Sequence, residues 1–112
     1  MGHLLIVAAS QELRRSLQFA VEADGHTVHV SAGMETPGDS ELRYDCTVFD
    51  HHAADRKSRD AIRDFFASHG PVVLLANSAS HPLAAISHST VLKPLLGPAL
   101  SRAVANAIDA DT

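Results

Sequence analysis

Short apolar runs recur along the chain, and segments with helical spacing or turn residues separate them. The runs are HLLIV (3–7), HTVHV (26–30), CTVFD (46–50), PVVLLA (71–76) and VLK (91–93). Continuous apolar runs of this length are typical of strands that are buried on both faces of a parallel sheet. The run at 26–30 alternates polar and apolar residues, which indicates a strand nearer the edge.

Three of the intervening segments predict amphipathic helices. The first begins at a capping residue, Ser10, and stops at Gly25. The second covers residues 58–69, and the third starts after Gly97-Pro98. Apolar residues recur at helical spacing in each of them. The expected buried positions are Leu13, Leu17, Ala20, Val21, Ile62, Phe65, Phe66, Leu100, Ala103, Val104, Ala107 and Ile108.

Two other segments predict short or irregular helices. Residues 31–43 show little periodicity and contain the turn signal Thr36-Pro37-Gly38, so at most a short helix fits around 39–43. Pro82 suits the first turn of a helix, but only about two turns fit before Ser89.

Strands that alternate with helices predict an α/β protein with one doubly wound parallel sheet. The length of 112 residues fits a single domain, 1–112. In such folds the usual site is the crevice at the carboxyl ends of the strands. Three positions reach it on this interpretation: Ala8 or Ala9, Asp50 and Lys93.

Composition narrows the class of protein. The net charge of −4 gives no basic footprint for direct nucleic-acid binding. The single cysteine, Cys46, lies in an apolar run and is expected to be a buried structural thiol. The chain has no apolar run of the roughly 20 residues that a membrane span needs and no signal-peptide pattern, so we expect a cytoplasmic protein.

Four stretches, LLIVAASQELRRSLQFAVEADGHTV, YDCTVFDHHAAD, PVVLLA and VLKP, together resemble the receiver domain of two-component response regulators. The resemblance extends over nearly the whole chain. It implies a (βα)5 flavodoxin-like fold with strand order 2-1-3-4-5 and a role in bacterial signal transduction. It also implies a phosphorelay site: an acidic pair that binds Mg²⁺, a phosphoacceptor aspartate, a Thr or Ser, an aromatic residue and a Lys-Pro step.

Only part of that site carries over to this sequence. Asp50 matches the phosphoacceptor, and Lys93 matches the lysine step. The acidic pair is replaced by Ala8 and Ala9. The two switch positions of the family fall on Ala76, with Ser78 as a displaced substitute, and on Thr90.

These departures weaken the expected phosphorylation chemistry. Phosphoryl transfer depends on positioning and charge neutralisation, and Mg²⁺ is held by carboxylates together with phosphate oxygens. With Ala8 and Ala9 in place, we expect weak or absent Mg²⁺ binding, no cofactor, no catalytic residues and no enzyme activity. Asp50 and Lys93 are then expected to form a structural ion pair. The alternative is a receiver that accepts a phosphoryl group on Asp50 from a histidine kinase and regulates transcription.

The sequence has eight histidines, which raises the possibility of a transition-metal site. Asp50 and His52 are the candidate ligands, and His81 and His88 flank the short helix and could approach them. Neighbouring residues that leave a strand point apart, so His51 and His52 are not expected to share an ion. The simpler interpretation is that the histidines are solvated or capping.

Two functional hypotheses follow. The first is an atypical receiver-like module that acts by protein contact or homodimerisation. The contact would use the face formed by the short helix after Pro82, the strand 91–93 and the last helix. A DNA-binding or ATPase output domain would lie outside this chain. The second is an enzyme or small-ligand binder on a flavodoxin-like sheet, which the absence of glycine from AASQEL disfavours for phosphate-bearing ligands.

Overall fold

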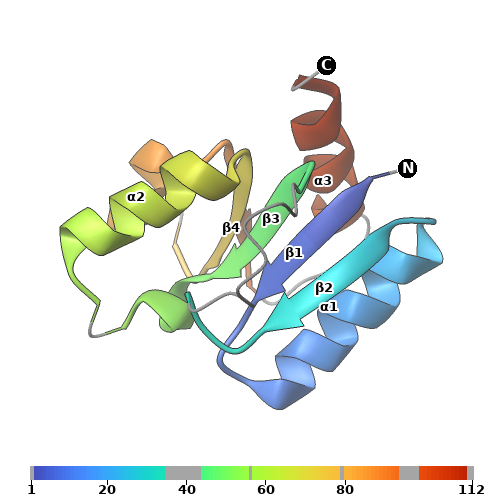
Figure 1. Ribbon diagram of the computed structural model, residues 1–112, viewed down its shortest axis with the longest axis horizontal. Coiled ribbons are helices and arrows are strands. Elements are labelled where there is room, and N and C mark those ends of the chain that lie inside the picture. The colour runs from blue at the N-terminus through green and yellow to red at the C-terminus, as the bar shows by residue number, and fades with distance from the viewer. Residues whose placement is uncertain (1, 35–43, 56, 79, 94–98, 111–112) are drawn as a thin grey trace.

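The computed structural model describes residues 2–34, 44–55, 57–78, 80–93 and 99–110. Its centre is a sheet of five parallel strands in the order β2-β1-β3-β4-β5 (Figure 1). The strands are β1 (His3–Val7), β2 (Thr27–Ser31), β3 (Cys46–Asp50), β4 (Val72–Ala76) and β5 (Ser89–Leu92). This arrangement confirms the predicted fold class and strand order.

Helices cover both faces of the sheet. On one face lie α1 (Gln11–Ala23) and α3 (Ala99–Ala110). On the other lie α2 (Arg59–His69) and two 3-10 helices, η1 (His51–Ala54) and η2 (Pro82–Ile86). Figure 1 shows α2 on the opposite side of the strands from α1 and α3. The sheet is therefore doubly wound, with a separate apolar core on each side.

The alternation of side chains along β1 explains why its sequence is apolar throughout. Leu4 and Ile6 belong to the core under α1 and α3, whereas Leu5 and Val7 belong to the core under α2. Phe49 of β3 is fully buried in the second core. Its ring contacts Phe65 at 5.7 Å and Phe66 at 4.9 Å between centroids.

Ser10 and Gly25 mark the two ends of α1 as the sequence predicts. Ser10 accepts a hydrogen bond from the Leu13 backbone N–H and caps α1. Gly25 follows that helix with a positive φ of 93°, which a residue with a Cβ rarely adopts. The expected inward faces of α1, α2 and α3 are confirmed with one exception. Ala20 is exposed, because the inward stripe of α1 narrows to Leu17 and Val21 in its second half.

The last strand begins earlier than predicted. β5 spans Ser89–Leu92 rather than 91–93, so Lys93 lies just beyond its end. The polar residues Ser89 and Thr90 hid this start, because a half-buried edge strand accepts polar side chains that a central strand buried on both faces does not. The segment after Pro82 forms a short 3-10 helix, as its length suggested. The helix expected around 39–43 and the Gly97-Pro98 start lie outside the described residues.

Cys46 is fully buried in the core under α1 and α3. Burial raises the pKa of its thiol to about 12, as expected for a structural cysteine. Among the helices in the described ranges, none combines the length and the apolar character needed to cross a bilayer.

Candidate functional site

Asp50 and Lys93 meet at the carboxyl end of the sheet. Asp50 ends the central strand β3 and is only 1 % exposed. The Lys93 ammonium forms an ion pair with its Oδ1 atom. The Lys93 backbone N–H also donates to the Ala76 carbonyl at the end of β4, at 2.9 Å. These contacts tie the ends of β3, β4 and β5 together.

The end of β1 lies beside this pair and carries no carboxylate. Val7 pairs with Phe49, so Ala8 follows β1 at the level of Asp50. Ala8 is fully buried, and Ala9 is exposed. Alanines therefore stand at the two positions where the resemblance puts metal-binding acids.

A guanidinium occupies this end of β1 instead. Arg14 Nη1 donates to the Ala8 carbonyl at 2.8 Å and to the Ala9 carbonyl at 3.1 Å. The sequence pattern did not predict this role of Arg14. The available signal was its position one helical turn after the capping residue Ser10, which directs its side chain back towards the strand end.

The site does not fit Mg²⁺. The ion needs near-octahedral oxygen ligands with one or two carboxylates. Here Asp50 offers one carboxylate, and its Oδ1 atom already faces the Lys93 ammonium. The Arg14 guanidinium brings a second positive charge to the end of β1. The site therefore supports no reaction step through this metal.

A transition-metal site gains no support from the histidines. The described residues contain no group of three or more His, Cys, Asp or Glu side chains arranged to hold a metal. His52, one of the two candidate ligands, pairs with Asp55 at 3.3 Å instead.

Three histidines cluster beside the ion pair. The rings of His51 and His52 lie 4.0 Å apart, and the ring of His81 lies 5.1 Å from that of His51. The expectation that His51 and His52 point apart is wrong, because they lie on the 3-10 helix η1 rather than on an extended chain. His81 approaches as expected. His88 does not, because its N–H donates to Val72 at the opposite end of β4.

His51 has a buried ring nitrogen and a shifted pKa. Its Nε2 atom is buried and has no hydrogen-bond partner among the described residues. Burial lowers the pKa of His51 below its ordinary value of 6.5, and nearby His52, Lys93 and His81 lower it further. Asp50 opposes this shift. The neutral imidazole is therefore the form that the folded protein prefers.

This shift predicts a loss of stability in mild acid. Since the folded-state pKa of His51 lies below the unfolded value of 6.5, the unfolded chain takes up the proton first as the pH falls. The free energy of unfolding should therefore be highest above that value and decrease as the pH falls through it. Urea unfolding between about pH 7.5 and about pH 5.5 measures the slope.

The variant His51→Gln should flatten this slope because it removes the titrating ring. His88→Gln is the matched control, since His88 is an exposed histidine far from the cluster. An unchanged slope in His51→Gln would assign the acid sensitivity to another group.

The two switch positions lack the groups that the resemblance calls for. Ala76 is fully buried at the end of β4 and has no hydroxyl. Ser78 lies two residues beyond the end of β4, and its Oγ atom lies 2.8 Å from Ser80 Oγ. Thr90 lies half-buried on β5, where a threonine offers no ring to rotate. Ala76 and Thr90 therefore lack the hydroxyl and the ring through which the family's switch would act.

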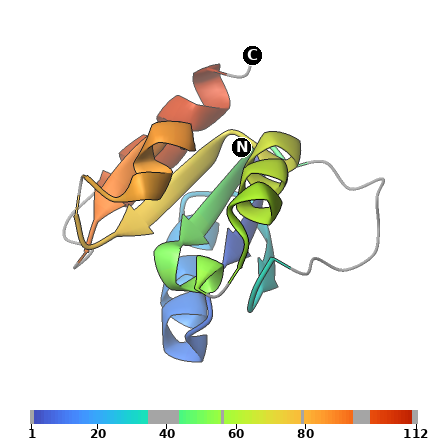
Figure 2. The same cartoon turned by 90° about the vertical axis from the view of Figure 1, so that its left-hand side faces the viewer.

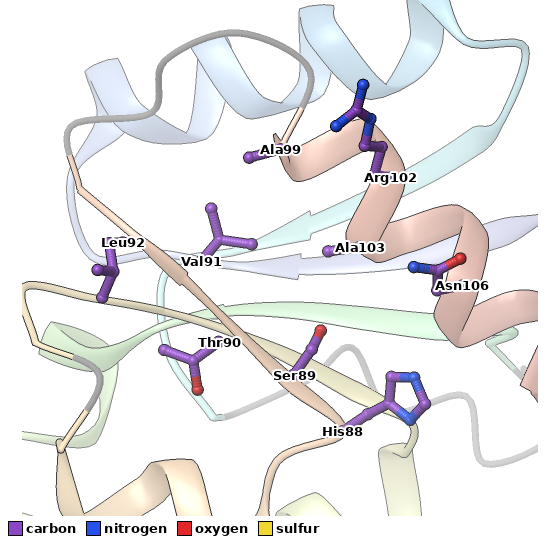
Figure 3. Close-up of a pocket in the computed structure, with 9 residues that line it drawn as sticks. All are labelled: His88, Ser89, Thr90, Val91, Leu92, Ala99, Arg102, Ala103 and Asn106. Atoms are coloured by element: carbon purple, nitrogen blue, oxygen red, sulfur yellow. The ribbon is translucent and has the colours of Figure 1, made fainter.

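A second concave feature lies between β5 and α3. It is a groove of about 480 Å³. Figure 3 shows it lined by residues from both elements: His88, Ser89, Thr90, Val91, Leu92, Ala99, Arg102, Ala103 and Asn106. The sequence pointed to this face of the molecule but not to a groove.

Comparisons with known proteins place the fold in one class. No family model and no curated protein matches the chain. Solved structures do match, and several of them are response regulator receiver domains. A receiver domain from Clostridium thermocellum has a TM-score of 0.77 at 18 % identity and covers 99 % of this chain and 97 % of its own. The Vibrio cholerae chemotaxis protein CheY4 has a TM-score of 0.79 at 15 % identity, covering 96 % and 98 %.

One of these structures contains the metal that the present site does not fit. The receiver domain of a Pseudomonas aeruginosa sensor histidine kinase holds a magnesium ion in its active-site cleft. It matches with a TM-score of 0.77 at 18 % identity and covers 96 % of this chain and 98 % of its own. The chain thus has the fold of the receiver domains that it matches.

Proposed function

We propose that this chain is an atypical receiver domain of bacterial signal transduction that acts through protein contacts. In this proposal Asp50 takes up little or no phosphoryl group in the presence of Mg²⁺. The observation that carries the proposal is the pairing of the buried Asp50 carboxylate with Lys93. The neighbouring end of β1 carries Ala8 and Ala9 in place of carboxylates, and Arg14 donates to the carbonyls of both.

Phosphoryl transfer to Asp50 faces two physical obstacles here. The carboxylate is 1 % exposed, and its Oδ1 atom is paired with Lys93, so a phosphodonor has little access to a free oxygen. The incoming group also adds negative charge beside a carboxylate, and a metal normally offsets that charge. One ammonium provides a single positive charge without the octahedral template of a divalent ion.

Contact through the β5 side of the domain is the second part of the proposal. Leu92 of β5 is 47 % exposed, and Ile86 of the neighbouring η2 is 40 % exposed. Apolar side chains on an exposed edge favour contact with another protein. The partner is a second copy of the chain or another protein. Transcription regulation would then belong to a DNA-binding or ATPase domain outside this chain.

Incubation with acetyl phosphate or beryllofluoride in the presence of Mg²⁺ tests the first part. We expect no stoichiometric adduct by intact mass and no shift of the Asp50 region in amide NMR spectra. A magnesium-binding receiver domain treated in parallel shows that the reagents are active.

The variant Asp50→Asn completes this test. A stoichiometric adduct that forms on the native protein and disappears in Asp50→Asn would overturn the proposal. It would support the alternative of a phosphorylatable receiver, in which the Asp50–Lys93 pair is a working phosphoacceptor site.

A further inference from the structure

β5 is an edge strand of the sheet that the described residues form. The strand order places β5 at one end of the sheet, with β4 as its neighbour. No other strand of the described chain pairs with it, and Figure 2 shows it at the margin of the sheet next to α3. An edge strand presents unpaired backbone N–H and C=O groups, which can add an extended segment of another chain.

The groove runs along this edge and combines apolar and polar groups. Val91, Leu92, Ala99 and Ala103 provide apolar walls. The Ser89 hydroxyl points from β5 towards α3 in Figure 3. Its Oγ atom is buried and has no hydrogen-bond partner among the described residues. A buried hydroxyl without a partner is costly, so a ligand that bonds to it gains affinity.

The charge of the groove is positive within an acidic protein. Arg102 lines it from α3 and forms no ion pair with any described side chain. No aspartate or glutamate is among the lining residues, and the whole chain carries a net charge of −4. An anionic group in the groove would therefore meet Arg102 without a competing carboxylate from the groove itself.

We infer that this groove binds an extended acidic segment of a partner protein, which adds to β5 as a further strand. Backbone bonds to the edge supply affinity, and side chains alternate between the groove and solvent. A carboxylate of the segment pairs with Arg102, and an apolar side chain packs on Ala103 and Val91. The inference rests on the proposed function, since it names the partner of the β5 surface.

A second copy of the chain fits this surface less well. In a two-fold symmetric contact the same surface of both copies meets. The groove lining contains no aspartate or glutamate, so a second copy of the groove offers no carboxylate to pair with Arg102. Charge complementarity therefore selects an acidic segment over self-association.

NMR titration of the ¹⁵N-labelled protein tests the inference. The probe is a short capped peptide that alternates aspartate with valine, and the matched probe replaces each aspartate by asparagine. We expect the acidic peptide to shift the amides of 88–92 and 99–106 and to bind at least about tenfold more tightly than the neutral one, an advantage that added salt reduces.

Two charge-reversal variants make the test specific. Arg102→Glu should weaken binding of the acidic peptide by about tenfold or more. Arg63→Glu is the control, because it makes the same change of net charge on the exposed surface of α2, on the opposite side of the sheet. It should change binding by less than about twofold.

Several results would overturn the inference: no shifts at any peptide concentration, equal binding of both peptides, or shifts outside β5 and α3. Concentration-dependent sedimentation of the protein alone, lost in a variant of the β5 edge such as Leu92→Asp, would assign the surface to a second copy instead. The adduct experiment on Asp50 is read by intact mass, which is independent of the peptide titration. An adduct would contradict the proposed function without contradicting the peptide site. Absence of peptide binding would contradict the peptide site without contradicting the proposed function.

Discussion

Replacing Lys93 by methionine should lower the free energy of unfolding by about 3 kcal/mol. The change leaves the buried Asp50 carboxylate without its ammonium, while methionine keeps much of the packing of the lysine stem. An uncompensated buried charge is strongly destabilising even where the intact pair itself contributes little. Thermal unfolding followed by circular dichroism should show a midpoint lower by on the order of 10 °C.

Two further variants separate the loss of the pair from the loss of a lysine. Lys57→Met removes an exposed lysine that pairs with no described carboxylate, and it should change stability by less than about 0.5 kcal/mol. The double variant Asp50→Leu with Lys93→Met removes both charges and should recover much of the lost stability. Equal effects of Lys93→Met and Lys57→Met would mean that the pair is not desolvated.

The variant Ala8→Asp with Ala9→Asp should make stability depend on Mg²⁺. The new carboxylates stand at the end of β1 beside Asp50, and Ala8 is fully buried, so the variant is destabilised without a metal. Saturating Mg²⁺ at about one hundred times its dissociation constant should restore about 2.7 kcal/mol. The native protein should show no such dependence in the same thermal unfolding series.

Arg14 should limit this gain. Its guanidinium contacts the carbonyls of Ala8 and Ala9 and would compete with Mg²⁺ for the new carboxylates. Adding Arg14→Ala should therefore strengthen Mg²⁺ binding, as isothermal titration measures. The control Ala20→Asp with Ala23→Asp places the same charges on the exposed surface of α1 and should give no metal dependence. If the site variant also gives none, the end of β1 is not a latent metal site.

Much of the fold could be predicted because strands buried on both faces consist of uninterrupted apolar runs. The three central strands are of this kind, so β1, β3 and β4 are plain in the sequence. The edge strand β5 is not, since Ser89 and Thr90 look like loop residues. The narrowing of the buried face of α1, which exposes Ala20, depends on the angle at which the helix packs on the sheet.

The site could be predicted only where a residue acts from the end of a strand. Asp50 and Lys93 follow strands whose order in the sheet was predicted, so their meeting was foreseeable. The contact of Arg14 with the end of β1 depends on the conformation of its side chain, and the position of His51 depends on the 3-10 helix η1. Neither follows from residue spacing. The groove beside β5 depends on how α3 packs, which the sequence of α3 alone does not specify.

The position of Lys93 connects the Asp50 site with the β5 edge. Its backbone follows β5 directly, while its ammonium is held at β3 by Asp50. A ligand that adds to β5 and moves the Lys93 ammonium relative to Asp50 would change the energy of the Asp50–Lys93 pair. By thermodynamic reciprocity, any change of charge at Asp50 would then alter the affinity of the groove by the same factor. The domain would thus retain a route for communication that requires neither a metal nor a moving aromatic ring.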